Sequence, residues 1–180
     1  MTVEDHSPSR RTFLKESLLG VAVLSAAKVH PRLLLSDGVP AEVATQLHYF
    51  SGHEYMIVRA IAGCMVGRVP AETEDPIDAA LRADQFLSTA DEEVQDQIHQ
   101  LLTAFNGPFF TFLFDFRFSS FLRMKPQDQD SYLEDWMTST LAFRRKGFQA
   151  LKRLTLSMYY TDRRSWATIG YHGMTPEVRP

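Results

Sequence analysis

The feature that most constrains the fold of this chain is the helical spacing of its apolar residues. Ser51 can cap a helix, and Glu54 three residues later completes a capping box in which each side chain binds the other's backbone N–H. Phe50 and Tyr55 are placed for the apolar contact that often flanks such a cap. Apolar residues then recur at helical spacing, at Ile57, Val58, Ile61, Ala62 and Met65. We therefore expect a helix that begins after Ser51 and ends at Gly67.

Two further segments show the same period. Asp75-Pro76 is expected to open a helix, because Asp caps free backbone N–H groups and Pro is tolerated in the first turn. Ser88 or Thr89 is expected to cap the next helix, which ends at Asn106-Gly107-Pro108. The positions expected to share the apolar stripes of these helices are Ile77, Ala80, Leu81, Asp84, Leu87, Val94, Ile98, Leu101, Leu102 and Phe105.

The C-terminal part predicts two more helices and a short turn. Pro126 begins the first helix, and a long amphipathic stretch covers about residues 140–160. Asp162 is expected to cap a short turn that contains Trp166 and closes at Gly170. The residues expected to face the core are Tyr132, Leu133, Trp136, Met137, Phe143, Phe148, Leu151, Leu154, Thr155 and Met158. Those expected to face water or an acidic neighbour are Arg144, Arg145, Lys146, Lys152 and Arg153.

Phenylalanine is concentrated between residues 109 and 122, at Phe109, Phe110, Phe112, Phe114, Phe116, Phe118 and Phe121. The alternation from residue 110 to 118 is also typical of a strand, but no other run with period two is present to pair with it, so we expect a helix. A helix that is apolar all round must be buried, either in the centre of the domain or against another protein.

These patterns predict an all-α fold, a compact bundle of about five to seven helices after an N-terminal export signal. We divide the chain into a signal segment (1–27), a linker (28–49), a helical domain (50–173) and a C-terminal tail (174–180). The linker contains a Leu33-Leu34-Leu35 cluster that could lie along the domain or a partner.

The first residues have the charged start, apolar middle and small-residue end of an export signal. Arg10 and Arg11 are followed at once by Phe13 and Leu14, an arrangement that resembles twin-arginine signals. Such signals direct folded proteins through the twin-arginine translocase, so we expect a periplasmic protein, with any membrane association made through its complex. The uncharged run 17–27 has 11 residues, fewer than the roughly 20 that span a bilayer.

The sequence lacks the usual marks of a cofactor or catalytic site. It has no Gly-rich dinucleotide or phosphate loop and no G-x-S-x-G, and its histidines, such as His48 and His53, are not at helical ligand spacing. The single cysteine, Cys64, is expected to be either a small buried residue on a helix or a thiol that bridges to a partner. The net charge of −3 argues against a nucleic-acid partner. We expect no catalytic, cofactor-binding or metal-binding residue in the chain.

An all-helical domain of this kind gains little by folding before export on its own account. We therefore expect it to bind a cofactor-loaded subunit and to lend that subunit its export signal. Two alternatives remain open: a stand-alone periplasmic helical scaffold or binding protein, and an enzyme whose ligands are scattered His, Asp and Glu residues.

The C-terminal segment resembles the closing motif of the gluconate 2-dehydrogenase subunit 3 family. That motif is an F-x-x-L-x-x-L-T helix that leads into Y-Y-T, then a Trp, then G-Y-x-G-P. Here it reads Phe148 to Asp162, Ser165-Trp166 and Ile169 to Gly173, with Met174 where the family has proline. A weaker likeness covers residues 50–66.

The resemblance implies a non-catalytic small subunit of an exported FAD-dependent dehydrogenase. In such complexes a large flavoprotein subunit of the glucose-methanol-choline type oxidises a sugar, sugar acid or other alcohol, and electrons pass to a cytochrome c subunit or a quinone. The small subunit assists folding of the large one and carries it out of the cytoplasm.

Large rings with a polar tip dominate protein interfaces, although here they could also close the C-terminal turn onto the core. The residues expected at the partner interface are Tyr159, Tyr160, Trp166, Tyr171, Phe112 and Phe116.

Overall fold

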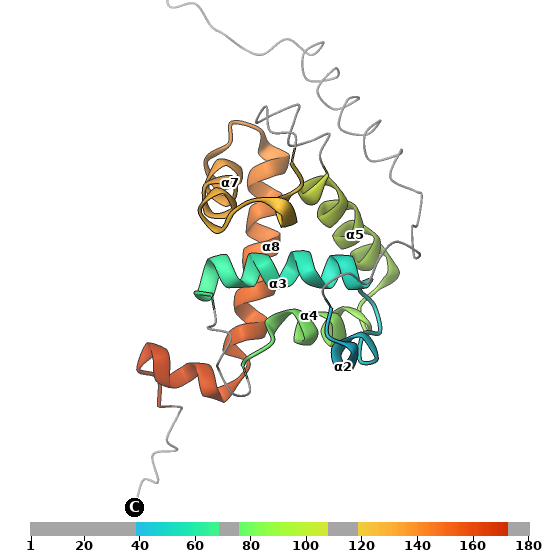
Figure 1. Ribbon diagram of the computed structural model, residues 1–180, viewed down its shortest axis with the longest axis vertical. Coiled ribbons are helices and arrows are strands. Elements are labelled where there is room, and N and C mark those ends of the chain that lie inside the picture. Colours follow the sequence, from blue (N-terminus) through green and yellow to red (C-terminus); the bar gives the residue numbers. More distant parts are fainter. Residues whose placement is uncertain (1–38, 69–75, 108–118, 173–180) are drawn as a thin grey trace, which may run out of the picture. The chain divides into compact units, whose positions relative to one another are not determined.

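The computed structural model describes residues 39–68, 76–107 and 119–172, and all regular structure in these residues is helical (Figure 1). The all-α prediction is therefore confirmed. The elements are α2 (Ala41–Ala44), α3 (Gly52–Val66), α4 (Ala79–Leu87), α5 (Glu92–Asn106), the 3-10 turn η1 (Phe121–Arg123), α7 (Pro126–Thr138), α8 (Ala142–Tyr160) and the 3-10 turn η2 (Arg163–Ile169). The expected export signal, Phe112, Phe116 and the C-terminal tail lie outside the described residues.

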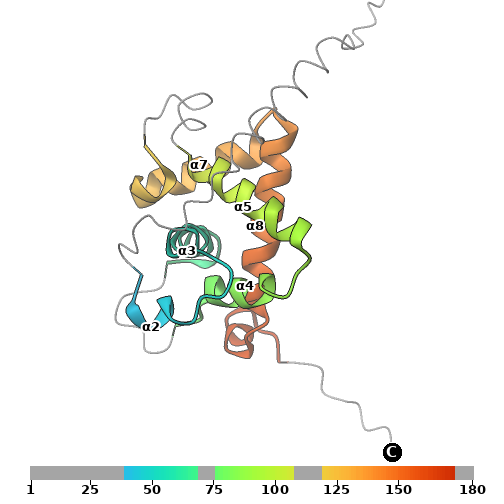
Figure 2. The same ribbon diagram turned by 90° about the vertical axis from the view of Figure 1, so that its right-hand side faces the viewer.

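Helix α8 is the element against which most of the others pack. It contacts α3, α4, α7 and η2. Figure 1 shows α8 passing behind α3 at a steep angle, and Figure 2 shows the same crossing with α3 seen end-on. In both views α7 lies near the N-terminal end of α8, and α4 lies against its C-terminal half. One helix thus connects elements from both halves of the described domain.

Four buried aromatic side chains join α5, η1 and α7. The ring centre of Phe105 lies 4.8 Å from that of Phe121, 5.1 Å from that of Tyr132 and 4.9 Å from that of Trp136, all in edge-to-face contacts. Such contacts add to the stabilisation that comes from burial alone. The hydroxyl of Tyr132 donates to the backbone oxygen of Phe105 at 2.8 Å. This cluster confirms the expected inward positions of Phe105, Tyr132 and Trp136.

The predicted capping box of α3 is present. The Ser51 hydroxyl accepts a hydrogen bond from the Glu54 backbone N–H at 3.3 Å, and the Glu54 carboxylate accepts from the Ser51 backbone N–H at 2.9 Å. Phe50 and Tyr55 are both buried. Gly67 follows the helix at φ +96°, a conformation that favours glycine, so the predicted end of the helix is also confirmed.

The expected cap of the next helix is wrong by three residues. Helix α4 begins at Ala79, because the carboxylate of Asp78 accepts from the backbone N–H groups of Ala80 and Leu81 at 3.0 and 2.9 Å. The second Asp78 oxygen accepts from the hydroxyl of Tyr55 at 2.6 Å. A tertiary contact with α3 therefore accompanies the cap at Asp78.

The expected cap of the following helix is also wrong. Ser88 ends α4 instead of starting α5, and its hydroxyl donates to the backbone oxygen of Gln85 at 2.8 Å. Helix α5 begins after Asp91, so Glu92 and Glu93 lie in its first turn, where the helix dipole favours negative charge. Asn106 is its last residue, as expected.

Two neighbouring residues of α8 exchange the expected positions. Arg144 is buried, and its guanidinium carbon lies 5.3 Å from the ring centre of Trp136 and 6.0 Å from that of Tyr132. Phe143, expected in the core, is 45% exposed, and its ring meets that of Trp136 edge to face at 6.2 Å between centres. The buried stripe of the helix is formed by Arg144, Gly147, Phe148, Leu151 and Thr155. A cation stacked on aromatic rings can occupy a core-facing position.

Val94 and Met137 are exposed, although both were expected in the core. The buried residues of α5 lie in its C-terminal half, at Leu102, Phe105 and Asn106, whereas Val94 lies in the first turn. Met137 lies in the last turn of α7 and borders a surface cavity.

The described part of the expected linker packs against the domain. The carboxylate of Asp84, which is fully buried in α4, accepts hydrogen bonds from the backbone N–H groups of His48, Tyr49 and Phe50 at 2.8, 2.9 and 2.6 Å. The apolar residues of this segment that contact the core are Val39, Val43, Leu47 and Tyr49. Asp84 can therefore occupy a buried position on an otherwise apolar stripe, because three backbone N–H groups bind its carboxylate.

Gly147 allows α8 to approach its neighbours closely. A Cβ atom at this position would lie 2.7 Å from Cδ1 of Leu101 and 2.8 Å from Cζ3 of Trp136. Both distances are shorter than a carbon–carbon contact allows, so a side chain here would push α8 away from α5 and α7.

We predict that Asp84→Asn lowers the free energy of unfolding by about 2–4 kcal/mol, because an amide offers one oxygen acceptor to three N–H donors and carries no charge. Urea denaturation would measure the change. Asp91→Asn makes the same chemical change at an exposed cap whose side chain makes no capping hydrogen bond, and it should be nearly neutral. Equal effects of the two substitutions would show that the three hydrogen bonds to Asp84 do not stabilise the fold.

We predict that Gly147→Ala lowers the free energy of unfolding by about 1–3 kcal/mol through overpacking, although alanine favours helices. Gly63→Ala in α3 is the matched control, since its Cβ would meet only Cγ of Arg68 at 3.5 Å, an ordinary contact. This control should leave stability unchanged or raise it by up to about 1 kcal/mol. Thermal denaturation of both variants provides the test, and a stabilised Gly147→Ala protein would exclude the close approach.

Candidate functional site

Four of the six aromatic residues expected at a partner interface come together where α8 ends. The rings of Tyr159 and Tyr160 lie 5.3 Å apart, and those of Trp166 and Tyr171 lie 5.0 Å apart. The indole N–H of Trp166 donates to the backbone oxygen of Tyr160 at 2.9 Å, which joins the two pairs. Tyr160, Tyr171 and the neighbouring Ile169 are exposed. We call Tyr159, Tyr160, Trp166, Ile169 and Tyr171 the C-terminal aromatic surface.

Asp162 holds this surface in place, as its expected capping role predicts. Its carboxylate accepts from the backbone N–H of Arg164 at 2.9 Å and from the guanidinium groups of Arg164 and Arg82 at 2.6 and 2.7 Å. These bonds, those of Arg164 first, hold the pKa of Asp162 well below its ordinary value. Because Arg82 belongs to α4, the start of η2 is tied to a second helix. Gly170, at φ +68°, ends the turn.

The chemistry of the C-terminal aromatic surface suits contact with another protein. The guanidinium carbon of Arg163 lies 5.7 Å from the ring centre of Trp166, so a positive charge is stacked on an indole at the surface. Tyr, Trp and Arg are the residue types enriched at protein interfaces and at their energetic hot spots.

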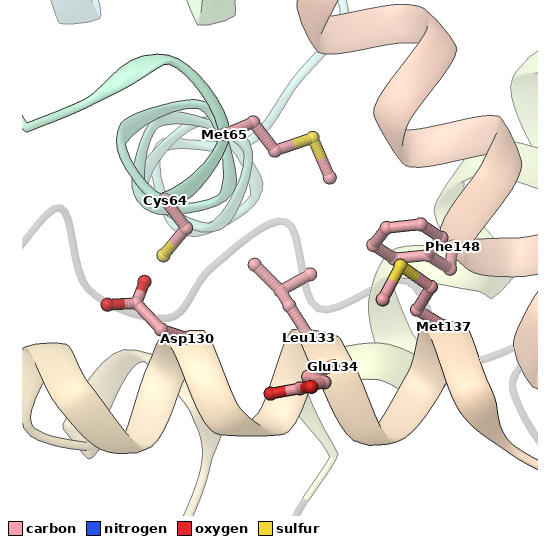
Figure 3. A pocket seen from close by; sticks show the side chains of 7 residues that line it. All are labelled: Cys64, Met65, Asp130, Leu133, Glu134, Met137 and Phe148. Atoms are coloured by element: carbon pink, nitrogen blue, oxygen red, sulfur yellow. The ribbon is translucent and has the colours of Figure 1, made fainter.

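A surface cavity of about 250 Å³ lies between α3, α7 and α8 (Figure 3). Its lining residues are Cys64, Met65, Asp130, Leu133, Glu134, Met137 and Phe148. Figure 3 shows the sulfur of Cys64 directed toward the Asp130 carboxylate, with Met65 and Phe148 on the opposite side. The lining is therefore apolar at one end and charged at the other.

Cys64 is neither fully buried nor freely accessible. Its sulfur accepts a hydrogen bond from the guanidinium of Arg68 at 3.2 Å, and Arg68 in turn binds both carboxylate oxygens of Asp130 at 2.9 and 3.1 Å. Burial, followed by the hydrogen bond with Asp130, raises the pKa of the thiol to about 12. The group is therefore protonated at neutral pH, which makes it a weak nucleophile.

A second polar cluster joins the start of α3 to α5, and sequence reasoning missed it. Nδ1 of His99 forms a short hydrogen bond with the Glu54 carboxylate, and the ring of Tyr49 lies 4.4 Å from that of His99. Burial alone raises the pKa of Glu54, but the hydrogen bonds from His99 and Ser51 outweigh it, so the pKa is lowered overall. The capping box marked Glu54, whereas nothing in the sequence marked its partner 45 residues away.

Within residues 39–68, 76–107 and 119–172, no group of three or more His, Cys, Asp or Glu side chains is placed to hold a metal ion. No helix in the same ranges combines the length and apolar character needed to cross a membrane.

We predict that the stabilising effect of Glu54 depends on pH. A lowered carboxyl pKa stabilises the fold above the unfolded value of about 4.3, and this contribution is lost as the pH falls through the folded pKa. Glu54→Gln should therefore cost about 1 kcal/mol at neutral pH, and the difference from the unsubstituted protein should shrink below about pH 4. Denaturation across this range, with exposed Glu134→Gln as control, measures it. A pH-independent difference would contradict the prediction.

In comparisons with known proteins, no family model, no curated protein and no solved structure matches this chain. The function must therefore be inferred from the residues and their geometry.

Proposed function

We propose that this protein is the non-catalytic small subunit of an exported FAD-dependent dehydrogenase complex of the glucose-methanol-choline type. It assists folding and assembly of the large flavoprotein subunit and carries that subunit through the twin-arginine pathway to the periplasm. The large subunit holds the FAD and oxidises a sugar, sugar acid or other alcohol, and its electrons pass to a cytochrome c subunit or a membrane quinone.

The single observation that carries this proposal is the Arg10-Arg11 pair followed by Phe13 and Leu14. A twin-arginine signal is useful to a protein that must fold before export, either because it holds a cofactor or because it travels with a subunit that does. A helical domain with an exposed surface for that subunit fits the second case.

The exposed C-terminal aromatic surface supports the same proposal. Its residues lie within the C-terminal segment that resembles the gluconate 2-dehydrogenase subunit 3 family, and Tyr160 and Tyr171 are exposed instead of packed into the core. Exposed apolar rings that gather at one place are typical of a binding surface. The Asp162 hydrogen bonds fix this surface in advance, which lowers the entropy lost on binding.

The proposal predicts that Arg10→Lys/Arg11→Lys strands a flavoprotein in the cytoplasm, because the partner depends on this chain for export. The full-length chain would carry a C-terminal affinity tag, and FAD released from the co-purified material would be measured by fluorescence in cytoplasmic and periplasmic fractions. Arg32→Lys, the same change outside the motif, serves as the control and should leave the distribution unaltered.

Export of the flavoprotein at the normal level by the double variant would contradict the escort role. Purification of the unsubstituted chain as a colourless monomer, without flavin, would instead support a stand-alone scaffold. Turnover of a substrate by that isolated chain would exclude the non-catalytic assignment altogether.

A further inference from the structure

Charge is strongly segregated along the chain. Residues 142–172 contain seven Lys or Arg and one Asp, whereas residues 76–107 contain six Asp or Glu and one Arg. The whole protein has a net charge of −3. Helix α8 and turn η2 are thus the positive part of a negatively charged protein.

The positive charge of α8 is concentrated on its outer face. Arg145, Lys146, Lys152 and Arg153 are all exposed. Lys152 lies seven positions after Arg145, and Arg153 lies seven positions after Lys146. Seven residues make about two helical turns, so each pair lies on the same side of the helix. The buried stripe lies on the opposite side of the helix. Tyr160 continues the outer face at the C-terminal end and leads into the C-terminal aromatic surface. We call Arg145, Lys146, Lys152, Arg153 and Tyr160 the basic face.

The placement of this charge opposes the stability of the helix. Arg144, Arg145 and Lys146 lie near the N-terminal end of α8, its first turn contains no acidic residue, and the N-cap residue Leu141 makes no side-chain cap hydrogen bond. The helix dipole disfavours cations at this end, and because the effect falls off beyond the first turn it acts more on Arg145 than on Lys146. Departures from local stability rules of this kind are expected at functional sites.

Neighbouring side chains do not neutralise the basic face. Among the described residues, Lys146, Lys152 and Arg153 form no ion pair. Arg145 donates to the backbone oxygens of Ser139 and Thr140 at 2.6 and 2.8 Å, which fixes its guanidinium over the loop before α8. The three remaining cations are therefore available to negative groups from outside the domain.

We infer that the basic face of α8 docks onto an acidic surface of the large flavoprotein subunit; this inference rests on the proposed function. Complementary charge increases the rate and specificity of such an encounter, and the adjacent Tyr160 and Trp166 supply the apolar contact that slows dissociation. A membrane surface fits less well, because a helix that lies on lipid inserts its apolar side, and the apolar side of α8, including Phe148 and Leu151, is buried in the core.

The test uses the full-length tagged chain in its own host, with Lys152→Glu/Arg153→Glu as the variant. Both residues lie in the middle of α8, away from its termini and its buried stripe. We expect the FAD retained per chain to fall roughly tenfold or more, and the unsubstituted complex to dissociate as salt concentration rises. Lys152→Gln/Arg153→Gln should give an intermediate loss, and unchanged thermal denaturation of both variants verifies folding.

Arg123→Glu/Lys125→Glu is the matched control. It makes the same charge change at two exposed residues at η1 and just before α7, and it should leave the retained FAD unaltered. Equal loss in the control and the α8 variant would overturn the inference, since net charge alone would then explain the effect.

Other outcomes separate this inference from the proposed function. If the unsubstituted chain retains FAD and the α8 variant retains as much, the docking surface is wrong while the escort role stands. If the unsubstituted chain retains no FAD, the proposed function fails. The purified chain can also be tested for binding to phosphatidylglycerol vesicles. If the α8 variant loses this binding while its FAD retention is unchanged, the basic face binds a lipid surface and protein docking is overturned. If the unsubstituted chain forms a dimer that the α8 variant does not form, and FAD retention is unchanged, the basic face binds a second copy of this chain.

Discussion

The hydrogen bonds of one buried carboxylate, that of Asp84, determine how the chain enters its helical domain. Removing a carboxylate from water costs several kcal/mol unless donors replace the lost hydration, and here three consecutive backbone N–H groups do so. These N–H groups belong to the residues just before α3. The start of α3, with its capping box, is therefore fixed relative to α4. Helix α3 in turn crosses α8, which contacts α4, α7 and η2 as well. The arrangement of the helices therefore depends on a polar interaction together with aromatic packing.

Local rules predicted a large part of this fold. The capping box at Ser51, the helix start at Pro126 and the Asp162 turn closed by Gly170 all depend on residues a few positions apart. The errors arose where distant residues decide the outcome. Asp78 caps α4 with a hydrogen bond from Tyr55 that the sequence does not reveal, and Arg144 is buried because two rings of α7 receive it. The aromatic residues of the candidate site were predicted, whereas their mutual arrangement depends on packing.

The two sides of α8 differ in burial and charge. Its inner side has a glycine where a Cβ atom would collide with side chains of α5 and α7, and the rest of that side is buried in the core. Its outer side carries cations that contribute nothing to that packing. A helix held firmly on one side presents the other side with little loss of conformational entropy on binding. The proposed docking role thus draws on the same rigidity that holds the domain together.

The environment of Cys64 has a consequence for the proposed export of this chain. Disulfide exchange requires the thiolate, and a thiol whose pKa is raised to about 12 supplies very little of it at neutral pH. The Arg68–Asp130 pair also covers one side of the sulfur. The lone sulfhydryl is therefore slow to form mixed disulfides, and we expect the chain to pass through an oxidising compartment without becoming covalently linked to its neighbours.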